Sequence, residues 1–153
     1  MGRLSRLAST MAGFWPRGAV HGGAAVLVIG LAACASVPGG GITKDSPIEA
    51  KRAVLTERIN ARWEALIKGD LDQAYAYLSA ASKEAYPLNV YKGGTRPGMW
   101  KAVKINSIDC EGEICLAGMT LTYDHRMMKG VQTPFAEQWI IEKGTAWYIY
   151  QPR

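Results

Sequence analysis

The sequence predicts a small α+β domain, with two to three N-terminal helices packed on the concave face of a curved four-stranded antiparallel sheet. Apolar residues recur at helical spacing between residues 46 and 86. After residue 99, apolar and polar residues instead alternate with a period of two. Helices followed by a run of strands are typical of a layered domain whose sheet buries one face on the helices. Residues 46–153 are enough for one such core and too few for two.

The first helix is expected to begin at Ser46, where the domain itself is expected to start. Ser46 can cap the helix, Pro47 suits its first position, and Glu49 completes a capping box. The apolar stripe that follows consists of Ile48, Leu55, Ile59, Trp63 and Leu66. The charged residues are expected mostly on the other face; they are Lys51, Glu57, Arg58, Arg62 and Lys68.

The next elements are predicted from the residues that end or begin helices and strands. Gly69 ends the first helix, and residues 70–73 repeat the capping pattern, so a second helix begins at once. A short helical turn is expected over 82–86, with a loop over 91–98. Strands are expected at 100–109, 115–127, 135–142 and 146–150, separated by turns at 111–112, 129–130 and 143–144.

Two segments carry a resemblance to a known superfamily. They are residues 63–75 (WEALIKGDLDQAY) and the aromatic closing strand 147–150 (WYIY). Together with four downstream strands, they resemble the nuclear transport factor two-like superfamily over nearly all of residues 46–153. The resemblance implies a cone-shaped fold with a pocket between the helices and the sheet. It implies no particular reaction, because members include isomerases, dehydratases, transport adaptors and binding modules.

The N-terminal segment is typical of an export signal. Three arginines and no acidic residue accompany the apolar run 24–31, which is shorter than the roughly 20 residues of a membrane span. The tetrapeptide 31–34 (LAAC) resembles the lipobox of bacterial lipoprotein precursors. We therefore expect a lipoprotein signal peptide at residues 1–33 and lipidation at Cys34, with Met1 and Met11 both open as start sites.

The segment after Cys34 is expected to be a flexible tether over residues 34–45, because it is rich in small residues and contains Pro38 followed by three glycines. The predicted partner is the membrane, reached through the lipid on Cys34. Ala35 follows that cysteine where some lipoproteins carry an aspartate, which by resemblance favours the outer membrane, with the domain facing the periplasm.

The net charge argues against nucleic acid as a partner. The whole chain carries 18 basic and 13 acidic residues, but the predicted signal peptide holds three of the basic ones. The remaining chain therefore has 15 basic and 13 acidic residues, a net charge of +2. It contains no basic run interleaved with aromatic residues, which such binding favours.

Once Cys34 is lipidated, two cysteines remain, Cys110 and Cys115. A disulfide between them suits an oxidising compartment. Two free thiols or half of a metal site are the alternatives. We expect no metal and no cofactor, because His125 is the one histidine after the signal peptide and no second cysteine pair exists.

A three-residue hairpin loop at 130–132 would place His125 opposite Glu137 and Tyr123 opposite Trp139. A histidine beside a carboxylate can act as a general acid/base pair, with Tyr123 as a donor. Structural pairing is the favoured interpretation, since cross-strand pairs of this kind commonly only stabilise a sheet.

Aromatic residues are abundant for so small a domain, which is compatible with a core or with a pocket for an apolar or planar ligand. The candidate pocket residues are Trp63, Tyr75, Tyr123, His125 and Trp139. Direct pairing of Cys110 with Cys115 would also turn Val103 and Ile105 outward, so we predict a β-bulge between Ile105 and Cys110.

The function most consistent with these patterns is an envelope lipoprotein whose domain binds a protein partner or a small apolar ligand, without catalysis. The alternative is a small dehydratase-like or isomerase-like enzyme that uses His125 and Glu137. A purely structural envelope component is a third possibility.

Overall fold

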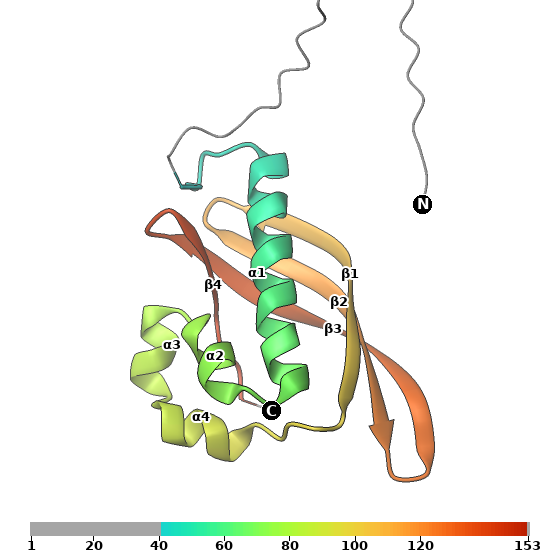
Figure 1. Ribbon diagram of the computed structural model, residues 1–153. Helices are drawn as coiled ribbons and strands as arrows, with labels where there is room; N and C mark the ends of the chain where they lie inside the picture. The colour runs from blue at the N-terminus through green and yellow to red at the C-terminus, as the bar shows by residue number, and fades with distance from the viewer. Residues whose placement is uncertain (1–40, 153) are drawn as a thin grey trace, which may run out of the picture. The chain divides into compact units, whose positions relative to one another are not determined.

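The computed structural model describes residues 41–152, which form an α+β domain (Figure 1). The predicted signal peptide, Cys34 and most of the expected tether lie outside the described residues. The elements, in chain order, are α1 (Ile48–Lys68), α2 (Leu71–Ala76), α3 (Ala80–Ala85), α4 (Leu88–Gly94), β1 (Trp100–Glu111), β2 (Ile114–His125), β3 (Met128–Glu142) and β4 (Thr145–Tyr148).

The sheet is antiparallel with the strand order β1-β2-β3-β4, and α1 lies across it (Figure 1). The three short helices follow α1 and pack beside its C-terminal half and β4. The predicted fold class is therefore confirmed, with one more helix than expected. Among residues 41–152, no helix is both long and apolar enough to cross a membrane.

The junction between α1 and α2 follows the sequence closely. Gly69 adopts a left-handed φ of 79°, which a residue without a Cβ tolerates, and its N–H donates to Leu66 O at 3.1 Å. The side chain of Asp70 then accepts a hydrogen bond from the Gln73 N–H at 3.0 Å and caps α2. Both signals are local, and both were predicted.

The start of α1 differs from the prediction. Ser46 does not cap the helix, because its Oγ accepts a hydrogen bond from the Thr43 N–H at 2.9 Å, and Pro47 occupies the cap position. The Ser46 side chain therefore closes a turn that precedes the helix.

That turn belongs to a segment that is already part of the folded domain. Ile42 is buried in the core, and its N–H donates to Gly144 O at 2.9 Å. The buried Lys51 Nζ donates to Lys44 O at 2.5 Å and to Gly112 O at 2.9 Å. The expected boundary at Ser46 therefore omits a core residue, and residues 42–44 do not behave as a tether.

The bulge predicted in β1 is confirmed, because the register with β2 shifts between Ile105 and Ser107. The shift keeps Val103 and Ile105 partly buried against the core while Ile108 is also buried. Without the shift, strict alternation would have turned either Val103 and Ile105 or Ile108 toward solvent.

The predicted turn between β2 and β3 was wrong. Instead of a turn at 129–130, β2 and β3 are joined at Arg126 and Met127, and Tyr123 pairs with Val131. Asp124 stabilises this arrangement, because its Oδ1 accepts the Gly130 N–H at 3.0 Å and its Oδ2 lies 3.6 Å from Lys129 Nζ. Arg126 takes a φ of 50°, so the turn forms without the glycine on which the prediction relied.

The prediction of a loop over 91–98 was wrong for residues 91–94, which belong to a helix. Helix α4 continues to Gly94, and Pro87 sits at its N-cap, so this proline begins a helix as well as following one. Tyr91 is buried because α4 turns its ring into the core.

The position of Ile42 predicts a stability effect from a residue outside the expected domain boundary. Ile42→Ala should lower the free energy of unfolding by about 2 kcal/mol, because it deletes buried methyl groups. Ile114→Ala is the matched control, since Ile114 is 39% exposed, and should cost under about 1 kcal/mol. Urea unfolding followed by tryptophan fluorescence measures both, and equal effects would exclude Ile42 from the folded unit.

Candidate functional site

A pocket of about 100 Å³ lies beside the C-terminal half of α1. Its walls come from α1, α4 and the loop after it, the first residue of β1, and the buried face of β3 and β4. The residues that define its character are Arg62, Trp63, Tyr91, Trp100 and Glu137. A buried charged pair and an aromatic lining therefore meet in one cavity.

The placement of Arg62 was missed by the sequence analysis, which expected it on the polar face of α1. Arg62 is buried instead. The signal was present in the spacing, because Arg62 lies three residues after Ile59 and four before Leu66, within the same apolar stripe. A charged residue on that stripe requires a buried partner.

Glu137 of β3 is that partner. Arg62 Nη1 donates to Glu137 Oε1 at 2.7 Å, and the two side chains are only 5% and 3% exposed. The Arg62 guanidinium also stacks over the Tyr148 ring, 3.7 Å from its centroid. Burial is the largest single effect and lowers the pKa of Arg62, but the charge and hydrogen bond of Glu137, together with Tyr148 and Tyr91, outweigh it, so the pKa is raised. Arg62 therefore stays charged.

Several polar atoms of this pair and its surroundings lack a regular hydrogen bond. They are Arg62 Nε, Glu137 Oε2, Trp63 Nε1 and the Tyr91 hydroxyl oxygen. The Tyr91 hydroxyl and the Arg62 guanidinium attract one another, although their geometry falls short of a regular bond. Burial raises the pKa of Tyr91, and the positive charge of Arg62 opposes this. Each buried polar atom without a partner costs about 1–3 kcal/mol.

Aromatic rings form the rest of the lining. Trp63 and Trp100 meet edge to face, with ring centroids 5.7 Å apart and an interplanar angle of 78°. Tyr91 and Tyr150 make a similar contact at 5.2 Å. These contacts fix the rings, so the pocket is bounded by rigid planar walls.

The predicted pairing of His125 with Glu137 was wrong. His125 pairs with Met128 beside the hairpin turn and is exposed, whereas Glu137 pairs with Ala117 and is buried. Eight residues of β2 separate the two positions, about 26 Å along a strand. The expected acid/base pair is therefore not assembled, because the hairpin turns at residues 126–127.

The other expected pocket residues divide between two cavities and the core. Trp63 lines the pocket around Arg62, whereas Tyr75 uses its hydroxyl to donate to the carbonyl oxygens of Lys83 and Tyr86. Trp139 is fully buried against Tyr148 and lines neither cavity. Tyr123 lies elsewhere, in the second cavity.

That second cavity has a volume of about 210 Å³ and lies near the base of the β2–β3 hairpin. Its lining residues are Met99, Trp100, Leu121, Tyr123, Thr133 and Phe135. The Thr133 hydroxyl donates to the Tyr123 hydroxyl oxygen at 3.3 Å. The lining carries no charged side chain. We take the smaller cavity as the candidate site because a buried ion pair and aromatic rings line it together.

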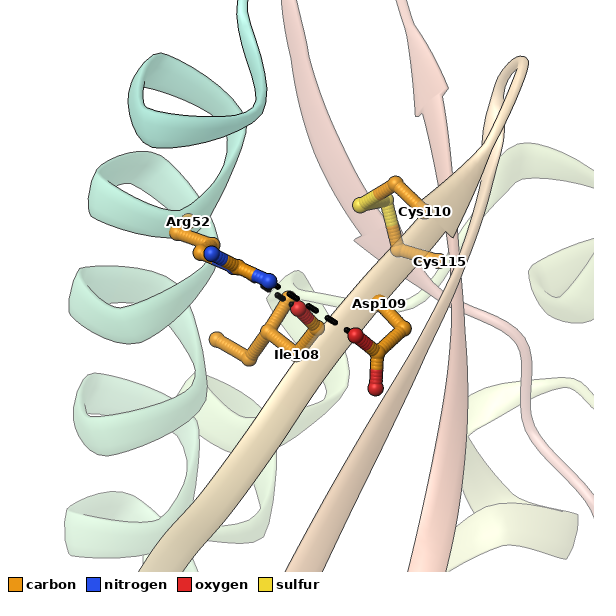
Figure 2. A network of polar contacts seen from close by, with 5 residues as sticks. All are labelled: Arg52, Ile108, Asp109, Cys110 and Cys115. Carbon is orange, nitrogen blue, oxygen red and sulfur yellow. Dashed lines mark hydrogen bonds and ion pairs between the residues drawn. A yellow bond between two sulfur atoms is a disulfide. The ribbon is translucent and has the colours of Figure 1, made fainter.

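The two cysteines lie at the opposite end of α1 from the pocket, beside the β1–β2 turn. Figure 2 shows Cys110 and Cys115 joined by a disulfide, with an S–S distance of 2.05 Å. Next to them, Arg52 Nε donates to Ile108 O at 2.9 Å, and its guanidinium lies 3.6 Å from Asp109 (Figure 2). Within residues 41–152, no cluster of three metal-ligating side chains occurs.

Comparisons with known proteins add little to this geometry. No protein-family model matches the chain, and no curated protein matches it in sequence. A solved structure with a partly similar fold is the solution structure of a SEC-C motif-containing protein from Rhodopseudomonas palustris. The two are 12% identical, the match covers 71% of this chain and 79% of the other, and the TM-score is 0.47. We draw no functional conclusion from this likeness.

The buried ion pair predicts strong coupling between α1 and β3. Arg62→Met or Glu137→Leu alone should lower the free energy of unfolding by about 3–5 kcal/mol, because each leaves an uncompensated buried charge. The double variant should lose less than either single variant. Urea unfolding of all three, analysed as a double-mutant cycle, measures the coupling.

The exposed Glu64–Lys68 pair on the same helix is the matched control for this cycle. Replacing it with Glu64→Leu and Lys68→Met should leave the free energy of unfolding nearly unchanged, because solvent screens exposed pairs. Additive effects of the Arg62 and Glu137 substitutions would contradict the coupling.

Proposed function

We propose that this chain is an envelope lipoprotein whose α+β domain is a non-catalytic binding module, and that the pocket around Arg62 holds a small ligand or one side chain of a protein partner. The observation that carries the proposal is the combination of rigid aromatic walls with a buried ion pair in one cavity. Concave sites that combine aromatic walls with convergent polar groups are typical binding sites.

The size of the cavity limits what it holds. An engineered apolar cavity of about 150 Å³ in another protein binds benzene. The pocket here has a volume of about 100 Å³ and opens to solvent, so it suits a single ring whose outer edge remains exposed. Larger ligands would bind through one such ring.

The chemistry of the pocket favours binding over catalysis. The enzyme alternative relied on His125 and Glu137, and those residues lie on distant parts of the sheet. Within the pocket, Oε1 of Glu137 accepts a hydrogen bond from a permanently charged arginine. No histidine or cysteine is among the residues that line it. The described site therefore offers a recognition surface rather than a nucleophile or a proton shuttle.

The cellular setting of the proposal comes from the sequence. The charged start, the apolar run and the lipobox resemblance support export and lipidation at Cys34. The resemblance to nuclear transport factor two-like proteins supports a pocket between helices and sheet. We propose attachment to the outer membrane with the domain facing the periplasm, because Ala35 follows Cys34 where some lipoproteins carry an aspartate.

Cys34→Ser tests the anchor. The thioether bond to the lipid requires the cysteine sulfur, so the variant should move from the membrane fraction to the soluble fraction of the envelope. Cell fractionation followed by immunoblotting measures this, with Cys110→Ser as a control that should remain with the membrane. Continued membrane association of the Cys34 variant would overturn the lipoprotein proposal.

The pocket is tested with small rings as probes. Toluene, phenol, benzoate and 2-pyridone are added to the protein, and the indole N–H signals are followed by NMR. At least one compound should shift the signals of Trp63 and Trp100 and leave that of Trp147 unchanged, because only the first two line the pocket.

Matched variants show which cavity is occupied. Thr95→Trp places a large ring at the pocket around Arg62 and should abolish the shifts, whereas Thr133→Trp fills the second cavity and should preserve them. Failure of every probe to bind, or shifts that survive Thr95→Trp, would contradict the proposed site.

A further inference from the structure

We infer that Arg58 of α1 and Lys83 of α3 form a surface site for a doubly charged oxyanion, the phosphate group of a phosphate monoester, beside Trp147 of β4. None of these three residues lines the pocket around Arg62, so the site goes beyond the proposed function. The inference follows from two cations that lack acidic partners and from the aromatic rings that hold them.

Arg58 is a half-buried arginine without an acceptor. In the part of the chain that the structure describes, its side chain makes no hydrogen bond and no ion pair. Its Nε is shielded from water, whereas its two Nη atoms are not, so these can reach a ligand. The other two arginines of α1 are paired, because Arg52 lies beside Asp109 and Arg62 binds Glu137. A guanidinium that offers several N–H donors therefore remains free only at Arg58 on this helix.

Lys83 supplies a second positive charge. Its Nζ donates to Ala76 O at 2.9 Å but, as far as the described residues go, forms no ion pair. The centroid of the Trp147 ring is 5.4 Å from Lys83 Nζ and 4.4 Å from Arg58 Cζ. The two charges are thus within about 10 Å of one another, one Debye length at 0.1 M salt, and act on the same anion. Burial and the charge of Arg58 lower the pKa of Lys83, so the two cations repel each other when the site is empty.

Aromatic rings hold both charges in place. The Arg58 guanidinium lies over the rings of Tyr77 and Trp147, and Lys83 Nζ lies 5.7 Å from the centroid of the Tyr75 ring. A ring face attracts a cation, but it is a weaker partner than a charged oxygen, which also accepts hydrogen bonds. The rings therefore position the donors and leave them available. Binding then costs little side-chain freedom, because the guanidinium is already held.

The charge and shape of the donors define the anion. A phosphate monoester carries a charge of about −1.5 to −2 at pH 7, which matches two unpaired cations, whereas a carboxylate would leave one cation unbalanced. The planar guanidinium suits two phosphate oxygens, and the ammonium group can bind the third. Glu57, the acidic neighbour of Arg58 in the chain, is exposed and forms no ion pair with it, so it compensates little of the positive charge.

The test titrates the protein with glycerol 3-phosphate and with acetate at neutral pH and constant ionic strength. NMR follows the indole N–H of Trp147, with those of Trp63 and Trp100 reporting on the pocket around Arg62. Glycerol 3-phosphate should shift the Trp147 signal with a dissociation constant at least about tenfold below that of acetate, because it carries the second charge. Equal binding of the two anions, or no shift of Trp147 with glycerol 3-phosphate, would overturn the inference and leave the proposed pocket untouched.

A third probe distinguishes the two sources of such a group. Dihexanoylphosphatidic acid carries the same phosphate on a water-soluble lipid. If it binds at least about tenfold more tightly than glycerol 3-phosphate, the site takes a lipid head group, because the acyl chains then add contacts. Equal or weaker binding indicates a soluble phosphate ester. Both results support the phosphate site.

Matched variants locate the binding. Arg58→Gln should weaken glycerol 3-phosphate binding at least about tenfold, because it removes a charge and the guanidinium donors. Lys83→Gln should weaken it at least about threefold, because it removes the second charge. Arg52→Gln, on the same helix but already paired with Asp109, is the control and should bind as before. Unchanged binding by a folded Arg58 variant would contradict the inference, and if that variant does not fold, the Lys83 variant decides it.

Discussion

The contact between Arg62 and Glu137 connects the two layers of this domain. One residue comes from the C-terminal half of α1 and the other from the buried face of β3, and 75 positions separate them in the chain. Because both side chains are shielded from water, the pair constrains the rotation of α1 and the register of β3 together. A one-residue shift of either element would separate the charges. The pocket follows from the same contact, since its aromatic walls are held around the guanidinium.

Structural features that depend on a few neighbouring residues were predicted from the sequence better than features that depend on distant ones. Gly69, Asp70 and the bulge after Ile105 were predicted, because a break, a cap and a reversal of sheet faces are visible within a few residues. Helix α4 was missed because its paired glycines were taken as loop residues, although Pro87 can begin a helix. The order and type of the main elements were therefore predictable.

The candidate site was predicted less well, for a physical reason. The partner of Glu137 depends on how β3 aligns with β2, and that alignment follows from the turn at Arg126 and from the contact between Asp124 and Gly130. The expected loop at 130–132 moved Glu137 eight places along β2 and brought it beside His125. Arg62 was assigned to solvent because charged residues are seldom buried, but its spacing placed it among Ile59 and Leu66. Among the expected pocket residues, Trp63 alone lines this cavity.

The segment before α1 contacts the turns of the sheet, and these contacts fix where the chain enters the domain. Gly41 lies so close to Gly144 that a Cβ on it would overlap the Gly144 carbonyl, and Lys51 fastens the following residues to the β1–β2 turn. The polypeptide therefore enters the domain at the N-terminal end of α1, with little freedom to swivel after Gly41. The pocket lies beside the C-terminal half of that helix, where its lining residues Arg62, Trp63 and Leu66 are about 21–27 Å from Ile48 at the rise of an α-helix. Whatever precedes Gly41 therefore joins the domain far from the residues that line the pocket.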